Sequence, residues 1–250
     1  MWTVCVRSVC TFLLVCASLT ALAQSDRARE ARWRAEVEPT LVVGEGLTLN
    51  AAGEDFFAIW TESDSSRKNP KALVLVHGVG VHPDFGLVGQ LRTLLHDAGY
   101  STLSLQMPVL AKEVSDGNAY TVTFTQSTAR IAAAAQWLRN KGYAQPVLIT
   151  HSMGAWMGNV YFQRTPNADY ARWVCIGITG SIGSLGNNHP RVLDLSGSED
   201  FPVTMDAAWL RRMKLWFLPG SETMVVDGAN HYFAGKEKQA ATVIDAFLKK

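Results

Sequence analysis

The stretch VLITHSMG, residues 147–154, decides the fold class. A short apolar strand ends near Thr150, and the residues that follow His151-Ser152-Met153-Gly154 favour a helix. A sharp turn from strand to helix holds a serine hydroxyl above the edge of a sheet and aims the next backbone N–H at the reaction centre. The stretch therefore predicts Ser152 as a nucleophile and the Met153 N–H as one donor to an oxyanion.

Thr150 departs from the common form of this motif, G-x-S-x-G, in which a glycine stands two residues before the serine. Glycine is favoured there because the strand and helix backbones crowd each other, so a threonine weakens the match. A serine at the start of a helix is also a good N-cap. Taken alone, the motif leaves that structural interpretation open.

A second signal lies upstream in LVLVHGVG, residues 73–80, where an apolar strand ends in His-Gly-x-Gly. Gly78 and Gly80 permit a close backbone approach, and the Val79 N–H is the expected second oxyanion donor. This loop precedes the serine by one strand-helix-strand-helix span. Together, the two signals favour a nucleophile over a helix cap.

A serine nucleophile needs a base, and in this arrangement the order along the chain is serine, acid, histidine. Of the six histidines, only His189 and His231 follow Ser152. His231 lies between the last expected strand and the C-terminal helix, so a loop can bring it over the strand ends. His189 lies in a polar loop before the remaining strands. We expect His231 to be the base.

The acid is expected just after the penultimate strand, in SGSED, residues 196–200. Asp200 stands at that place and is the first choice. Asp194 is the second, although a buried aspartate inside a strand also serves as a structural hydrogen-bond acceptor.

Several further side chains are expected around the site without acting as its base. His77, His82 and His151 are interpreted as wall or loop residues, of which His82 could touch a substrate. Trp156, one turn after Ser152, is the tryptophan best placed to line the acyl side.

From residue 72 onward, apolar strands alternate with amphipathic helices. This predicts one α/β domain whose mostly parallel, twisted sheet is covered by helices on both faces. Only about a dozen residues separate the strand ending near Thr179 from the one beginning near Arg191, which leaves no room for a lid domain. The cleft should be open, roofed at most by residues 108–122.

Residues 1–23 are predicted to be a signal peptide. Arg7 precedes an apolar run over residues 9–22, and Ala21 and Ala23 form a small-x-small cleavage site. The run is shorter than the roughly 20 apolar residues that span a bilayer, which disfavours a retained anchor. We expect export to the periplasm or beyond, a mobile or surface-helical leader over residues 24–40, and the α/β domain over residues 41–250.

Charge and cysteine content exclude several classes of protein. The chain carries 23 Lys and Arg against 22 Asp and Glu, and Arg7 lies in the predicted signal peptide, so the exported chain has a net charge of zero. That balance gives no reason to expect nucleic acid or an anionic membrane surface as a partner. Cys175 alone remains, so no internal disulfide can form, and its apolar surroundings predict a buried, inert thiol. No metal-binding or cofactor-binding motif is found, so no cofactor is expected.

The motifs HGVG, THSMG, GSED and NHYF, in that order, resemble the α/β-hydrolase superfamily over about residues 41–250. More narrowly, HGVGVHPDF followed by STLSLQMPVLAKE and VLITHSMGA resembles an uncharacterised branch of exported bacterial proteins of that superfamily. The resemblance implies the α/β-hydrolase fold and a triad of Ser152, Asp200 and His231, with Val79 and Met153 as oxyanion donors. It implies no substrate.

These observations predict a serine hydrolase that cleaves ester-type bonds of a small-molecule or lipid-like substrate through an acyl-enzyme. The alternative is a non-catalytic binding or assembly protein of the cell envelope that keeps the fold. A peptidase using the same triad is a third possibility.

Overall fold

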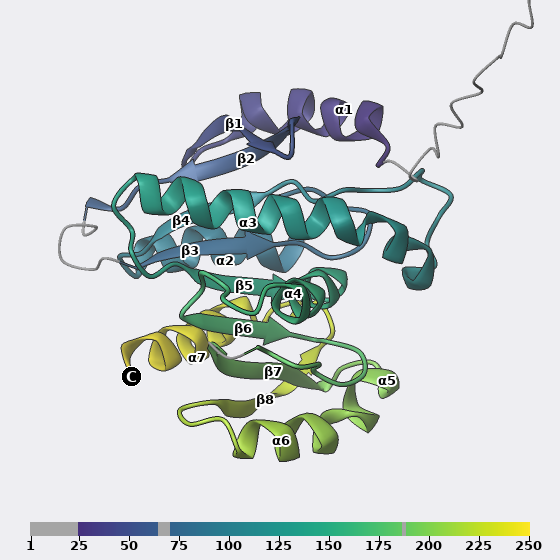
Figure 1. Cartoon of the computed structure of the whole chain (residues 1–250), viewed down its shortest axis with the longest axis vertical. Helices are drawn as coiled ribbons and strands as arrows, with labels where there is room; N and C mark the ends of the chain where they lie inside the picture. Colours follow the sequence, from purple (N-terminus) through teal and green to yellow (C-terminus); the bar gives the residue numbers. More distant parts are fainter. Residues whose placement is uncertain (1–24, 65–70, 187–188) are drawn as a thin grey trace, which may run out of the picture.

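The computed structural model describes residues 25–64, 71–186 and 189–250 (Figure 1). The predicted signal peptide at residues 1–23 lies outside the described residues. Among the helices that are described, none has the length and apolar character needed to cross a membrane.

A central sheet of eight strands organises the molecule, in the order β1-β2-β4-β3-β5-β6-β7-β8 (Figure 1). β2 pairs antiparallel with β1 and with β4, and all other neighbours are parallel. Short apolar strands such as β3 and β5 are buried along their whole length, as expected when both faces of a parallel sheet are covered. The mostly parallel sheet predicted from the sequence is confirmed. The strands are β1 (Glu45–Ala51), β2 (Glu54–Thr61), β3 (Ala72–Val76), β4 (Ser101–Leu105), β5 (Val147–His151), β6 (Arg172–Ile176), β7 (Arg191–Glu199) and β8 (Glu222–Asn230).

Helices cover both faces of this sheet. One hydrophobic cluster joins the sheet to α3 and α4, and a second joins it to α2 and α7 on the opposite face. The helices are α1 (Arg27–Val37), α2 (Gly86–Asp97), α3 (Phe124–Asn140), α4 (Met153–Arg164), α5 (Pro202–Asp206), α6 (Ala208–Trp216) and α7 (Glu237–Lys249), with 3-10 turns η1 (Glu38–Thr40) and η3 (Gly117–Thr123).

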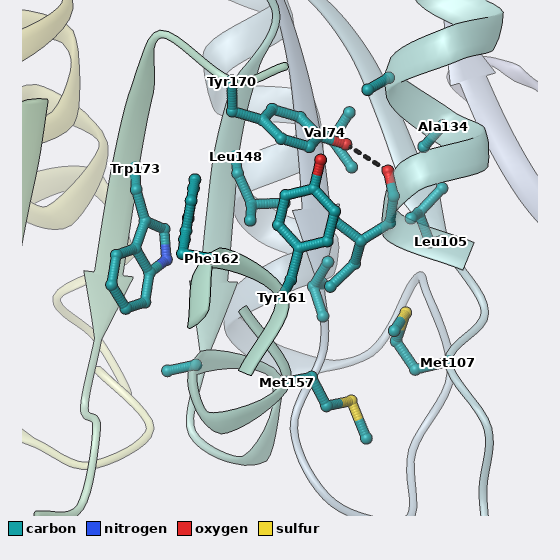
Figure 2. Packing of buried hydrophobic residues seen from close by; sticks show 14 of the residues in the cluster. Val74, Leu105, Met107, Ala134, Leu148, Met157, Tyr161, Phe162, Tyr170 and Trp173 are labelled. Carbon is teal, nitrogen blue, oxygen red and sulfur yellow. Dashed lines mark hydrogen bonds between the residues drawn. The ribbon is translucent and has the colours of Figure 1, made fainter. Parts of the chain in front are cut away.

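The cluster beneath α4 is rich in aromatic side chains (Figure 2). The rings of Phe162 and Trp173 lie 5.1 Å apart between centroids, and the hydroxyl of Tyr170 donates to the carbonyl of Ile131 at 2.7 Å. Cys175 is buried here as a free thiol, and burial raises its thiol pKa well above the ordinary value, as expected of an inert cysteine. The side of α4 that faces the sheet therefore packs against a buried aromatic cluster.

Two details differ from the predicted elements. Between β7 and β8 the sequence predicts one helix, at about residues 205–213. The structure has a pair of helices there, because Pro202 starts α5 directly after Phe201 and the chain begins again as α6 at Ala208. β6 ends at Ile176 rather than near Thr179, because Gly177 turns the chain with a φ of +61°. Apart from residues 187–188, the connection from β6 to β7 contains no helix, so the open architecture without a lid is also confirmed.

Candidate active site

Ser152 stands at the sharp turn between β5 and α4. Its backbone has φ 58° and ψ −119°, a conformation that is strained for any residue with a side chain, and its N–H donates to the carbonyl of Ile176 at 2.9 Å. The Ser152 side chain makes no capping hydrogen bond to α4. The turn therefore presents the hydroxyl away from the helix, unlike an N-cap.

Close packing of α4 on β3 requires the glycine after Met153. A Cβ atom on Gly154 would lie 2.6 Å from the carbonyl oxygens of both Val76 and His77. Atoms cannot approach that closely without moving backbone, so only glycine fits.

Thr150 is accommodated by a different glycine. Gly158, on the next turn of α4, lies over it, and a Cβ at Gly158 would approach the Thr150 methyl to 3.0 Å. The Thr150 hydroxyl accepts the indole N–H of Trp173 at 2.9 Å and donates to the carbonyl of Val174 at 3.2 Å. In G-x-S-x-G proteins the first glycine leaves room between strand and helix; here Gly158 on the helix leaves that room instead. The Thr150 hydroxyl has hydrogen-bond partners for both donating and accepting in the core.

His231 and Asp200 complete a chain of hydrogen bonds with the serine. His231 Nε2 lies 2.9 Å from Ser152 Oγ, and His231 Nδ1 lies 2.6 Å from Asp200 Oδ1. The three side chains come from the loops after β5, β7 and β8, whose carboxyl ends meet at one edge of the sheet. The structure thus brings together the three residues that chain order selected.

The aspartate is held in its ionised form. Burial raises the pKa of Asp200, but hydrogen bonds and charge from His231, together with the Phe201 N–H at 2.7 Å and the Thr204 hydroxyl, lower it below the ordinary value overall. Gly177 gives this pair its space, because a Cβ there would lie 3.1 Å from His231 Cε1. An ionised, buried carboxylate can orient the imidazole and stabilise its positive charge.

Asp194, the second choice for the acid, lies elsewhere. Its carboxylate accepts from Arg211 Nε at 2.9 Å, and both side chains are almost fully buried. Arg211 also donates to the carbonyls of Gly180 and Thr204 at 3.0 Å. This pair therefore ties α6 to β7 and to α5, rather than serving the histidine.

The loop after β3 passes directly beside the serine. A Cβ on Gly78 would lie 3.3 Å from Ser152 Cβ, and both Val79 and Met153 line the pocket around Ser152 and His231. The two residues expected to supply oxyanion donors, Val79 and Met153, thus both lie beside Ser152.

The N-terminal helix α1 holds that loop. Arg29 donates to the carbonyl of Gly80 at 2.8 Å and to that of Leu110 at 2.7 Å, while its guanidinium lies 4.5 Å from the ring centre of Trp33. A buried ion pair between Glu30 and Arg130, 2.9 Å apart, anchors the same helix. Residues 24–40, expected as a mobile or surface-helical leader, thus contain a helix that contacts the site's backbone.

His77 and His151 support the site as neutral side chains. His77 Nδ1 donates to the Gly78 carbonyl at 2.8 Å while Nε2 accepts the Met107 N–H at 2.9 Å, which defines one neutral tautomer. His151 Nε2 donates to the backbone carbonyl of His231 at 2.9 Å. Burial lowers the pKa of His77 to about 3 and that of His151 to about 4. Both are buried beside the site without lining the pocket, and neither contacts Ser152 as a base.

His82 and His189 also lie outside the pocket. His82 packs against Trp33 and Phe85, with ring centroids 5.7 and 5.6 Å away, and does not reach the pocket lining. His189 is exposed.

An open pocket of about 330 Å³ lies above Ser152. Trp156 lines it, as expected, and donates its indole N–H to the Thr179 carbonyl at 2.7 Å. Residues 115–118, within the loop expected as a roof, form another wall. Phe201 was not foreseen: its ring stacks on His231 with centroids 4.2 Å apart. Within the described parts of the chain, no group of three or more His, Cys, Asp or Glu side chains is arranged to hold a metal ion.

Solved structures with a similar backbone identify the fold. A serine hydrolase without a lid from Xanthomonas campestris is 12% identical, with a TM-score of 0.61, over 84% of this chain and 95% of that one. The fold is equally shared with a serine hydrolase homologue from Coxiella burnetii, at 15% identity and a TM-score of 0.59, over 82% of this chain and 98% of that one. An esterase from Pyrococcus furiosus is 13% identical, with a TM-score of 0.62, over 82% of this chain and 92% of that one.

The chain has the α/β-hydrolase fold. At these identities the similarity establishes the fold and no more. A family model described as a protein of unknown function (DUF3530) matches residues 9–128, which agrees with the predicted resemblance to an uncharacterised branch of α/β-hydrolase proteins. No curated protein matches the sequence.

Proposed function

We propose that this α/β-hydrolase-fold chain is a serine hydrolase that cleaves ester bonds through an acyl-enzyme on Ser152. The observation that carries the proposal is the unbroken hydrogen-bond chain from Ser152 through His231 to an ionised Asp200, at the floor of an open pocket. The backbone of Ser152 is strained, and its hydroxyl contacts a histidine rather than its own helix. Both features favour a role for Ser152 as a nucleophile.

The geometry supports the following sequence of steps. His231 Nε2 takes the hydroxyl proton as Ser152 Oγ attacks the ester carbonyl, and Asp200 stabilises the imidazolium that forms. The N–H groups of Val79 and Met153 are the donors proposed for the oxyanion. The imidazolium then gives its proton to the leaving alcohol. Water attacks the acyl-enzyme by the same route and restores the free serine.

The pocket favours an apolar acyl group. Its walls include Val79, Met153, Trp156, Phe201 and Val203, and no lid closes it. Apolar and aromatic walls bind hydrocarbon by excluding water, and an open mouth sets no strict limit on length. The proposed substrates are therefore carboxylic esters, including lipid-like ones.

The proposed location is the periplasm or the cell exterior, reached after cleavage at about Ala23. The N-terminal apolar run and its Ala-x-Ala site support this. Sequencing the N-terminus of the exported protein should find Gln24, and an intact Met1 on exported protein would refute it.

Turnover of short-chain aryl esters tests the chemistry. We expect Ser152→Ala and His231→Ala each to lower kcat by about a thousandfold or more, and Asp200→Asn to cost less. Ser181→Ala and His189→Ala are matched controls, because both side chains are exposed and neither lines the pocket. If Ser152→Ala keeps the parent rate, the assignment is wrong. If the folded parent hydrolyses amides but no esters, the chain is a peptidase instead.

A further inference from the structure

The helices after Asp200 expose an unusual amount of apolar surface. Most of the large apolar side chains that the described residues expose fall between Phe201 and Tyr232. Trp216 is 81% exposed, Phe217 79% and Trp209 60%. A single exposed apolar residue is normal in a soluble protein, but a contiguous group marks a binding surface.

Helical periodicity places these side chains on the outer side of α6. Arg211 and Leu215 face inward and are buried, whereas Trp209, Met213 and Trp216 lie on the opposite side. α6 therefore has an apolar outer side in addition to the side that packs on the sheet. We call the six residues Phe201, Val203, Trp209, Met213, Trp216 and Phe217 the α5–α6 face.

This face begins at the catalytic pocket. Phe201 and Val203 line the pocket and are themselves exposed, and Phe201 stacks on His231. Tyr232, 60% exposed, stands edge-on to Phe201 with ring centroids 6.1 Å apart. Figure 1 shows α5 at the carboxyl ends of the strands, with α6 running from it along the edge of the molecule. The α5 end of the face thus borders the pocket that holds Ser152.

The charges on α6 itself are all positive, whereas the exposed Asp206 ends α5. Between Asp206 and Glu222 the sequence has no acidic residue, and Glu222 is paired with Lys250 at 2.6 Å. Arg212 is exposed beside the tryptophans, and Lys214 on the other flank donates to the carbonyl of Ile182 at 2.8 Å. Basic side chains flanking Trp and Phe on one helix are typical of helices that lie at an anionic membrane surface.

We propose that the α5–α6 face docks on an anionic lipid surface and sets the mouth of the catalytic pocket at the boundary between lipid and water. A convex helix that presents two tryptophans inserts into headgroups and acyl chains without needing a complementary groove. The zero net charge of the predicted exported chain gave no reason to expect such a partner, but a membrane surface interacts with the local cluster of charges rather than with the net charge of the whole chain. Docking is independent of catalysis. The consequence that acyl chains pass from the lipid to Ser152 depends on the proposed function.

Vesicle flotation tests docking without catalysis. The protein is the Ser152→Ala chain beginning at Gln24, since the whole sheet and both large hydrophobic clusters lie within the described residues. The vesicles contain phosphatidylethanolamine and phosphatidylglycerol at about three to one. We expect the parent to float, and Trp209→Ser with Trp216→Ser to lower the lipid partition coefficient at least about tenfold.

Matched variants separate the contributions of exposed apolar area and of positive charge to vesicle binding. Val42→Ser with Phe85→Ser removes two exposed apolar side chains elsewhere and should leave partition unchanged. Arg212→Ser should lower partition about fivefold on anionic vesicles and leave it unchanged on phosphatidylcholine alone. A parent that does not float, or a double tryptophan variant that floats equally well, would overturn the proposal. So would a solution mass of two chains that falls to one in the tryptophan variant, because the face would then pair two copies.

An active pair of proteins separates docking from the proposed chemistry. With Ser152 intact, the double tryptophan variant should hydrolyse a soluble aryl ester at the parent rate but lose at least about tenfold on an ester embedded in the vesicles. If the parent floats but hydrolyses neither ester, docking stands and the proposed function fails. Equal loss on both esters would refute a role for the face in delivery.

Discussion

Replacing Thr150 by glycine would restore the usual elbow motif, and we expect it to damage the protein. The side chain is fully buried, and its hydroxyl is the partner of the Trp173 indole N–H. Leaving that donor unpaired in the core costs about 1–3 kcal/mol. The lost methyl adds about 1 kcal/mol, and a glycine in a strand another 0.5–1 kcal/mol or so. The expected loss is about 2.5–5 kcal/mol of unfolding free energy.

Urea unfolding of the Thr150→Gly protein measures this directly, with the midpoint shifted and the slope unchanged. Because Gly158 already supplies the space above residue 150, ester turnover of the folded fraction should not rise. A variant that is as stable as the parent and faster on esters would refute the reasoning, since the missing elbow glycine would then be limiting.

A double-mutant cycle tests the same contact from the helix. Gly158→Ala places a methyl 3.0 Å from the Thr150 methyl, so it should destabilise the parent. Thr150→Ser keeps the hydroxyl and removes the opposing methyl. In that background the cost of Gly158→Ala should fall by about 1 kcal/mol, whereas additive costs would show that the two positions do not interact.

Three further outcomes are expected. Both buried histidines, His77 and His151, have folded pKa values below the ordinary 6.5, so the stability that their neutral forms contribute is complete above that pH and is lost as pH falls. By pH 5, each should lower the free energy of unfolding by about 2 kcal/mol, measured by urea unfolding. An unfolding free energy that stays constant from pH 7 to 5 would refute this prediction. Asp194→Asn leaves Arg211 buried without its counter-charge and should lower the free energy of unfolding by about 3–5 kcal/mol. The kcat of the folded enzyme should change far less. A stable but inactive variant would instead make Asp194 the acid of the triad. Arg29→Met removes the hydrogen bond to the carbonyl of Gly80 and should lower kcat on aryl esters about tenfold, with KM little changed. Arg29→Lys should restore part of the lost kcat. A variant that loses stability but keeps kcat would show a purely structural role for Arg29.

The candidate triad could be predicted because it depends on the order of elements along the chain. Parallel strands place their carboxyl ends at one edge, so Ser152, Asp200 and His231, each following a different strand, must converge there. The same logic placed Val79 and Met153 at the pocket. Neither step needs knowledge of side-chain packing.

Other features could not be predicted because they depend on tertiary contacts between distant segments. Nothing in the sequence pairs Thr150 with Gly158 and Trp173, since a glycine in a helix reads only as a weak position. Arg29 reads as one charge among many in a polar leader until its contact with Gly80 is seen.

The exposed side of α6 was missed for a related reason. Tryptophans in a helix are ordinarily expected to pack in a core, and only the exposure of Trp209 and Trp216 reveals a surface. The sequence left Asp194 as the second choice for the acid, and its partner Arg211 lies on a helix whose bounds were misjudged.

Labelling with a fluorophosphonate probe tests the central claim most directly, because the probe forms a covalent bond only with a serine that a neighbouring base activates. Intact-mass measurement should show one adduct per chain, peptide mapping should place it on Ser152, and Ser152→Ala and His231→Ala should take up none. A folded protein that takes up no probe, or takes it up on another serine, would contradict the account.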